Sequence, residues 1–485
     1  MRANRRANQS VQFRLLSDGQ LEELYDAALH LLEHTGLDLH HQEARVLLRE
    51  AGAWVEGVRV RLPSHLVRSA LATAPRSFTV FSREGNPEKD LHLGPGRFYF
   101  GPGPTCPSFR DPRTGERREY TRADARAVAT VCDALPSIDF VESLGTIGDI
   151  PHELADVYEF ADMIAHTGKP IVAWSYAEAG CREIHEMAVA VAGGAEAFAR
   201  RPNYIFYCEP LSPLVCNAEA MDKVWYCARQ RIPLIFTPCV IGGGTGPVTM
   251  AGIVAQAAAE SWLGLVVSQL LRPGTPSCMG GVLSCLDMKE TVLAYGAPEL
   301  SLLQAGLTEL AHYVGLPLWT TGGCTDSKLP DEQAAIEGAL SLLFSALSGG
   351  DLCHDVGYIE SAMTGSLQQL VMMEEAISCI KRIIRGVEVT RESLAVEVIH
   401  SVGPGGNFLS EDHTLRHFRR EFWLPRLMDR SRRETWERTG SKTMGDRVQE
   451  RLNEILDTHR PVPLPAGAQE KIDAILTTAQ ARRPP

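Results

Sequence analysis

Residues 316–360 decide the fold, and they read LPLWTTGGCTDSKLPDEQAAIEGALSLLFSALSGGDLCHDVGYIE. The apolar run Leu316–Thr321 predicts a short strand that ends at two glycines. A helix is expected to begin at Pro330–Asp331, because proline is favoured at the first helical position. It ends at Gly349–Gly350, and a second strand starts at Leu352. Ionisable side chains follow both strands, as they do in the active site of a barrel.

The same pattern of strand, polar loop and helix repeats eight times between residues 97 and 385. The span approaches the roughly 250 residues of a (β/α)8 barrel, and short apolar runs suit buried parallel strands. A doubly wound open sheet is the alternative, but the repeats carry no dinucleotide fingerprint. We therefore predict an α/β chain built on a (β/α)8 TIM barrel. The expected strands are 98–101, 138–145, 170–176, 204–211, 233–241, 277–282, 316–321 and 352–358. The expected helices are 121–134, 152–167, 178–193, 217–230, 248–271, 297–314, 331–348 and 366–385.

Three regions are expected. They are a small α+β N-terminal region at 1–96, the barrel at 97–386 and a helical C-terminal cap at 387–485 that packs against the barrel. Residues 1–16 are expected to be frayed. Further helices are predicted at 17–50, 64–73 and 444–458, and further strands at 58–62 and 78–82.

Composition narrows the class of protein. A formal net charge of −12 disfavours general nucleic-acid binding. No run of about 18 uncharged apolar residues predicts a membrane span, and the basic N-terminus lacks the apolar core of a secretory signal. The 12 cysteines form no CxxC pair, so we expect reduced, mostly buried thiols in a cytoplasmic protein.

Three motifs at the strand ends admit both a chemical and a structural interpretation. GGGTGP at 242–247 is either a phosphate cradle or a tight turn, and it lacks the ending of a P-loop. Lys328 is either an imine-forming lysine or a partner in a salt bridge with nearby acids. Cys324 and His354 could meet across neighbouring strands as ligands of a catalytic zinc ion.

Aromatic and acidic residues dominate the remaining strand ends. Such a set suits a quaternary ammonium ion, which has no N–H group to donate and is held by cation–π and Coulomb contacts. Alternation along a strand also sends some aromatic residues into the layer between barrel and helices, so each of them could equally be core. The aromatic set is Trp174, Tyr176, Tyr207, Trp319 and Tyr358, and the acids are Glu209, Asp326 and Glu360.

The chain resembles the trimethylamine methyltransferase family, whose members are corrinoid-dependent methylamine methyltransferases with a (β/α)8 barrel. The segments that carry the resemblance are TGKPIV (167–172), GGGTGPVTMAG (242–252), GGCTDSKLPDEQAAIEGAL (322–340), HDVGYIES (354–361) and GGNFLSEDHTLRHFRREFWLPRLMDR (405–430).

The resemblance implies methyl transfer from an amine to the Co(I) corrinoid of a separate protein, with no cofactor held tightly by this chain and no metal of its own. Founding members of the family use pyrrolysine, and this sequence contains only standard residues. Members without pyrrolysine act on quaternary amines, so glycine betaine or a related betaine is the expected substrate. Candidate catalytic residues are Asp326, His354 and Glu209. Candidate substrate-binding residues are Trp174, Tyr176, Tyr207, Trp319, Tyr358, Glu360, Lys328, Gly243 and Gly244. The glycine N–H groups, His354 or Lys328 are the candidate donors to the betaine carboxylate.

The expected partners are the methylated amine and the cognate corrinoid protein, and the chain could form a homo-oligomer. Arginines and aromatic residues alternate in residues 413–433, which form either part of a docking surface or a cap helix paired with the acidic barrel. Two rival functions remain open: a barrel lyase or aldolase that uses Lys328 with Asp326, and a non-catalytic binder of quaternary amines.

Overall fold

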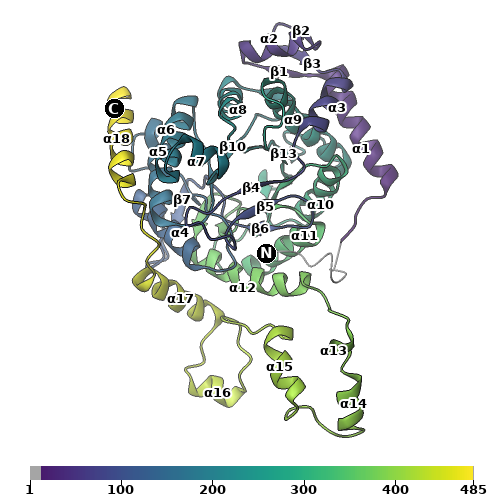
Figure 1. Cartoon of the computed structure of the whole chain (residues 1–485), viewed down its shortest axis with the longest axis vertical. Coiled ribbons are helices and arrows are strands. Elements are labelled where there is room, and N and C mark those ends of the chain that lie inside the picture. Colours follow the sequence, from purple (N-terminus) through teal and green to yellow (C-terminus); the bar gives the residue numbers. More distant parts are fainter. Residues whose placement is uncertain (1–12, 484–485) are drawn as a thin grey trace.

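A closed ring of parallel strands forms the centre of the molecule (Figure 1), in a computed structural model that describes residues 13–483. Seven strands pair in the order β6-β18-β17-β14-β12-β10-β9. The eighth segment runs through Val141, which bridges to Ile171, and the amide of Asp139 donates to the carbonyl of Phe100 at 2.6 Å. These two contacts close the predicted barrel. The strands are β6 (Tyr99–Phe100), β9 (Ile171–Ala173), β10 (Tyr204–Cys208), β12 (Leu234–Phe236), β14 (Ser277–Gly280), β17 (Leu318–Thr321) and β18 (Leu352–His354).

All eight predicted barrel helices are present. In α11 the side chain of Asp331 caps the helix by accepting from the amide of Ala334 at 3.0 Å, and Gly349 ends it with a φ of 89°. The helix α9 is long and apolar enough to cross a membrane, but most of it is buried inside the protein. The helices are α4 (Arg122–Ala134), α5 (His152–His166), α6 (Glu178–Ala192), α8 (Ala218–Gln230), α9 (Met250–Leu271), α10 (Pro298–Tyr313), α11 (Glu332–Ser348) and α12 (Leu367–Ile384).

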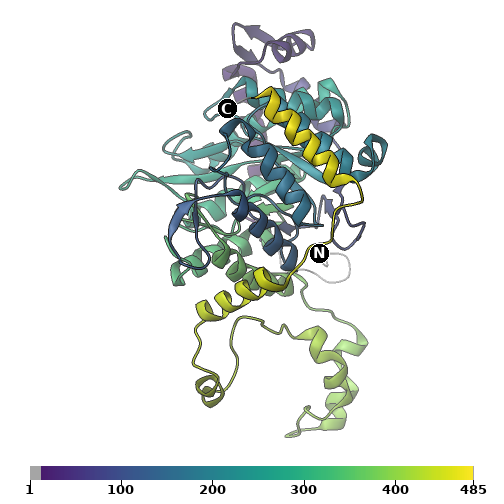
Figure 2. The ribbon, with the colours of Figure 1, turned by 90° about the vertical axis from the view of Figure 1, so that its left-hand side faces the viewer.

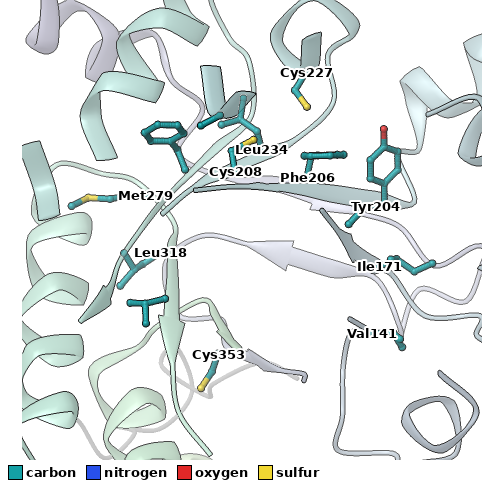
Figure 3. Packing of buried hydrophobic residues seen from close by; sticks show 14 of the residues in the cluster. Val141, Ile171, Tyr204, Phe206, Cys208, Cys227, Leu234, Met279, Leu318 and Cys353 are labelled. Atoms are coloured by element: carbon teal, nitrogen blue, oxygen red, sulfur yellow. The ribbon is translucent and has the colours of Figure 1, made fainter. Parts of the chain in front are cut away.

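Side chains alternate between two layers along each barrel strand. Those that point outward pack against the helices, as Figure 3 shows for Ile171, Phe206, Leu234 and Leu318. Those that point inward fill the barrel and form a separate cluster. The inward set includes Tyr99, Phe140, Val172, Trp174, Ile205, Tyr207, Ile235, Cys278, Trp319 and Leu352.

A hairpin from the N-terminal region closes the amino end of the barrel. Its strands β4 (Phe78–Val80) and β5 (Leu91–Leu93) are antiparallel, and Val80, Leu91 and Leu93 join the inward cluster. Only the carboxyl end of the barrel therefore remains for a ligand. The rest of the N-terminal region consists of α1 (Asp18–His30), a π-helical turn (Leu31–Thr35), β1 (Leu37–Leu39), α2 (Gln42–Glu50), β2 (Trp54–Glu56), β3 (Arg59–Arg61) and α3 (Ser64–Thr73).

The expectation of a frayed segment at residues 1–16 is wrong for its last four residues, and residues 1–12 lie outside the described part. The amide of Phe13 donates to the carbonyl of Leu347 at 3.2 Å. The amides of Leu15 and Leu16 donate to the carboxylate of Glu309 at 2.5 and 3.0 Å. The backbone is held here because the half-buried carboxylate of Glu309 on α10 accepts from two of its N–H groups.

Two different parts make up residues 387–485. Residues 387–443, here called the arm, contain α13 (Arg391–Leu394), α14 (Val396–Val402), α15 (Asp412–Glu421) and α16 (Arg433–Arg438), none of which has a buried residue. The arm projects from the side of the barrel (Figures 1 and 2). By contrast, α17 (Met444–Thr458) packs on α12 and α4, and α18 (Ala468–Arg482) packs on α6 and α5.

Two small sheets stand over the carboxyl end of the barrel. One pairs β13 (Cys239–Gly242) with β15 (Val282–Asp287) and β16 (Val292–Ala294). The other has the order β19-β20-β7-β8, from Tyr358–Ile359, Thr364–Ser366, Ser108–Arg110 and Arg117–Glu119. Two shorter elements, α7 (Ala195–Arg200) and β11 (Val215–Cys216), lie in the loops around β10.

Candidate active site

Four aromatic rings line the interior of the barrel near its carboxyl end. The ring of Trp319 on β17 is fully buried and stacks on the imidazole of His354 on β18, with centroids 4.3 Å apart and planes at 15°. The rings of Phe140 and Tyr207 lie 5.7 and 6.0 Å from that of Trp319. The interior therefore offers aromatic faces contributed by four different strands.

A second pair of aromatic residues follows β9. The rings of Trp174 and Tyr176 meet edge to face with centroids 4.8 Å apart. The indole N–H of Trp174 donates to the carboxylate of Glu159 on α5 at 3.1 Å, which fixes the orientation of the ring. Trp174 is 9% exposed and Tyr176 is half-buried, so both rings border the open end.

Glu142 is a fully buried acid beside these aromatic residues. It follows Phe140 by two residues and therefore points inward as Phe140 does. The side chain is fully buried, and neither carboxyl oxygen has a hydrogen-bond partner among the described residues. Burial raises the pKa of Glu142 well above its usual range, and the negative charges of Asp355 and Glu159 raise it further. Both effects favour the uncharged form of the carboxyl group over the carboxylate.

His354 and Asp355 form the centre of a polar network beside Glu142. The Nδ1 atom of His354 lies 2.6 Å from Oδ1 of Asp355, although the two are not in hydrogen-bonding geometry. The other oxygen of Asp355 accepts from the hydroxyl of Tyr295 at 2.5 Å. Asp355 has a φ of 74°, and a Cβ atom on Gly103 would stand 2.0 Å from its Oδ1 atom. Such left-handed backbone at a non-glycine residue is typical of functional sites.

Glu209 stands at the entrance of the same interior. Its carboxylate accepts from the hydroxyl of Tyr207 at 2.8 Å. The side chain is exposed, yet burial raises the pKa of Glu209, because protein surrounds the group on most sides. Glu209 therefore lies in a recess rather than on a convex surface.

The structure brings together six residues that the sequence analysis singled out and one more close by. The six are Trp174, Tyr176, Tyr207, Glu209, Trp319 and His354. Tyr358 is buried beside them, where its hydroxyl accepts from the amide of Thr105 at 2.9 Å and is near Asp355.

Asp326 has a different position from the one expected of a catalytic residue. Its carboxylate accepts from the amides of Tyr295 and Gly296 at 2.7 and 2.9 Å and from the hydroxyl of Ser361 at 2.7 Å. It thus ties the loops after β16, β17 and β19 together. The neighbouring Lys328 is exposed, and its ammonium group donates to the carbonyl of Asp326 at 2.8 Å.

Glu360, Gly243 and Gly244 also lie outside the interior. The carboxylate of Glu360 accepts from Arg117 at 2.8 Å in a partly exposed ion pair. The amides of Gly243 and Gly244 donate to the carbonyls of Gly246 and Ile241, so the GGGTGP segment is an exposed tight turn whose own backbone uses these N–H groups.

Glu142 and Asp355 were missed as site residues. The signal for Glu142 was a charged residue inside the mostly apolar segment FVESL at 140–144. Further buried polar atoms without a partner in residues 13–483 converge on the same interior. They are Thr237 Oγ1, Trp319 Nε1, His354 Nδ1 and Asp355 Oδ1. Orphaned polar atoms of this kind are rare in proteins and mark a place where a ligand or water is held.

The structure also bears on two other sequence expectations. Within residues 13–483 no group of three His, Cys, Asp or Glu side chains is placed to hold a metal ion, Cys324 and His354 included.

In the stretch 413–433, Arg416 and Arg420 pair with acids of the arm itself, whereas Arg426 pairs with Glu374 of α12. The expected ion pairs with the barrel therefore exist for Arg426, and docking stays a prediction.

The chain matches a known protein family. The model of the family described as trimethylamine methyltransferase matches residues 2–484 of this chain. A trimethylamine methyltransferase of Desulfitobacterium hafniense is 36% identical over 467 residues, covering 95% of this chain and 92% of that protein. A glycine betaine methyltransferase of the same species is 28% identical, covering 96% and 97%. The crystal structure of the Methanosarcina barkeri monomethylamine methyltransferase aligns with a TM-score of 0.53 and 9% identity, over 98% of this chain and 89% of that one, which shows a shared fold. The chain belongs to the trimethylamine methyltransferase family.

Proposed function

We propose that this enzyme transfers a methyl group from a quaternary amine, glycine betaine or a related betaine, to the Co(I) corrinoid of a separate partner protein. One observation carries the proposal: a closed aromatic interior contains a fully buried carboxyl group without a partner. Aromatic faces and carboxyl groups bind quaternary ammonium ions, which offer no N–H group. Membership of a family of amine methyltransferases supports the same reaction.

A quaternary substrate fits this chain better than trimethylamine. The sequence contains only standard residues, so the pyrrolysine of the founding members is absent. Removing a methyl group from a quaternary nitrogen releases a neutral tertiary amine, a leaving group that needs no acid. The glycine betaine methyltransferase among the relatives supports this choice.

The chain's own residues bind and orient the substrate. The Co(I) of the partner supplies the nucleophile when the partner docks at the open end of the barrel. The protein then has to hold one N–CH3 bond along the barrel axis, and positioning of this kind accounts for much of the rate of a transfer reaction. Because the nitrogen loses its positive charge during transfer, aromatic contacts from Trp319, Tyr207 and Trp174 suit it better than a permanent carboxylate would.

The carboxylate of a betaine requires hydrogen-bond donors. The interior supplies two donors without a partner, Trp319 Nε1 and Thr237 Oγ1, and the imidazole of His354, whose Nδ1 atom lies 2.6 Å from Asp355 Oδ1. We propose these in place of Gly243, Gly244 and Lys328, since the amides of both glycines are used in their turn and Lys328 is exposed. Burial makes such donors effective because little water competes for the anion.

The test is an anaerobic assay with the cognate corrinoid protein in its Co(I) state and a panel of tri- and tetramethylated amines. We expect the cobalt absorption spectrum to change to that of methylated cobalamin with glycine betaine or a related betaine. Mass spectrometry should then find the matching tertiary amine, dimethylglycine in the case of glycine betaine. Conversion with trimethylamine alone would refute the substrate, and no conversion with any of them would refute the reaction.

A further inference from the structure

Glu142 differs from every other acid around the barrel interior in having no hydrogen-bond donor. Glu159 accepts from the amide of Ile147 at 2.8 Å and from the indole of Trp174. Glu209 accepts from Tyr207, and Asp355 accepts from Tyr295. Both oxygens of Glu142 lack a partner in residues 13–483, although the side chain is completely buried. A buried carboxyl group without donors is costly, so its retention needs a reason.

The groups that interact electrostatically with Glu142 are acidic or phenolic, and the imidazole of His354 lies in the same network, 2.6 Å from Asp355. Asp355, which follows β18, and Glu159 on α5 act on it electrostatically. The phenols of Tyr207 on β10 and Tyr358 on β19 feel its charge in return. None of these groups offsets a negative charge, and together they hold the pKa of Glu142 high. Among residues 13–483, no lysine or arginine pairs with Glu142.

We propose that Glu142 takes up the positive charge of the bound substrate and that binding drives its proton into solvent. This inference rests on the proposed function, and it names the residue that recognises the cation. Without ligand the group is the uncharged acid. With a trimethylammonium group beside it, the proton leaves the carboxyl oxygen for water, and the resulting carboxylate faces the nitrogen. No bond to the substrate forms or breaks in this step.

The coupling follows from elementary electrostatics. An opposite charge within about 4–6 Å changes the proton affinity of a carboxyl group by about ten- to a thousandfold. The empty enzyme avoids an unpaired buried anion, and the complex has an ion pair. The arrangement also selects for charge, because an uncharged molecule of the same shape cannot make the proton leave.

In 3,3-dimethylbutanoate, carbon replaces the nitrogen of glycine betaine, so the trimethylated end carries no charge while the carboxylate is kept. Isothermal titration calorimetry in two buffers of different ionisation enthalpy counts the protons that each ligand releases. For the wild-type enzyme at neutral pH we expect about one proton released with glycine betaine and none with 3,3-dimethylbutanoate. The Kd for glycine betaine should fall up to tenfold for each unit of rising pH.

Two variants of the full chain test the assignment to Glu142. Glu142→Gln preserves the shape of the side chain and should abolish both the proton release and the dependence of Kd on pH. Glu159→Gln is the matched control, because Glu159 is also buried and acidic but already has donors, and this variant should still release the proton. An infrared difference spectrum between wild type and Glu142→Gln should show the carbonyl band of a protonated carboxyl group without ligand, and this band should disappear with glycine betaine.

The outcomes separate the inference from the proposed function. Glycine betaine that binds without proton release, or that still releases a proton in Glu142→Gln, would overturn the inference and leave methyl transfer intact. A missing carboxyl band in the ligand-free enzyme would overturn it as well. Failure of every methylated amine to bind would overturn the proposed function together with the inference, whatever the infrared spectrum shows.

Discussion

The substitution Glu142→Gln should change how the stability of the empty enzyme depends on pH. In the folded protein the pKa of Glu142 is raised well above its ordinary value of 4.5, chiefly by burial. Above a pH of about 4.5 the unfolded chain therefore loses this proton while the folded chain keeps it. The stability that the protonated group contributes is fully present below that pH and is lost as the pH rises toward the folded pKa.

The titration of a single carboxyl group sets how strongly the free energy of unfolding depends on pH. Each pH unit in this range costs the wild type up to about 1.4 kcal/mol of unfolding free energy, and glutamine does not titrate. Between pH 5.5 and 7.5 the variant should therefore gain about 3 kcal/mol relative to the wild type, provided that the folded carboxyl stays protonated.

Midpoints of urea unfolding, followed by the fluorescence of the seven tryptophans, would measure this difference at several pH values. Asp111→Asn serves as the control, because the backbone hydrogen bond from Thr114 lowers the pKa of Asp111 to about 2 and its carboxylate does not titrate over this range. Wild-type and Glu142→Gln midpoints that run parallel over this range would refute the assignment of an uncharged buried acid.

Three further predictions concern the site. Trp174→Ala and Tyr358→Ala should each weaken the binding of glycine betaine by about 2- to 30-fold in calorimetry, as loss of a cation–π contact implies, and unchanged affinity in both would contradict the aromatic cage. Lys328→Ala should retain methyl transfer, since the exposed ammonium group only contacts the carbonyl of Asp326, and borohydride trapping with substrate should label no lysine there. Gly103→Ala would place a Cβ atom 2.6 Å from the hydroxyl of Tyr358 and closer still to Asp355. It should therefore lower the free energy of thermal unfolding by about 1–3 kcal/mol and abolish activity. Wild-type stability and activity would show that Tyr358 and Asp355 move aside without cost.

The barrel itself could be predicted because its signals are local. Each short apolar run followed by a polar loop and an amphipathic helix became one unit of the barrel, and the run that contains Trp319 is typical. Alternation along the same strands left open which aromatic residues point inward. The structure places Trp174, Tyr207 and Trp319 in the inward cluster, with His354 stacked on Trp319.

The loops could not be predicted in the same way. Asp326 and Glu360 follow barrel strands and carry carboxylates, yet one binds loop amides and the other pairs with Arg117. Three successive left-handed residues, Glu360, Ser361 and Ala362, direct the chain back toward the loop after β17. Such turns depend on long-range hydrogen bonds rather than on periodicity, so their course is not visible in the sequence.

The sequence by itself determined the (β/α)8 barrel, the family and the aromatic character of the interior, because these depend on residue type and on a period of two or 3.6. The tertiary structure decided which polar groups are left without partners. Whether Glu142 is a paired surface acid or a buried one depends on neighbours such as Asp355, which lies more than two hundred residues away in the chain. Desolvation and charge are properties of the space around a group, and only the closed barrel creates that space.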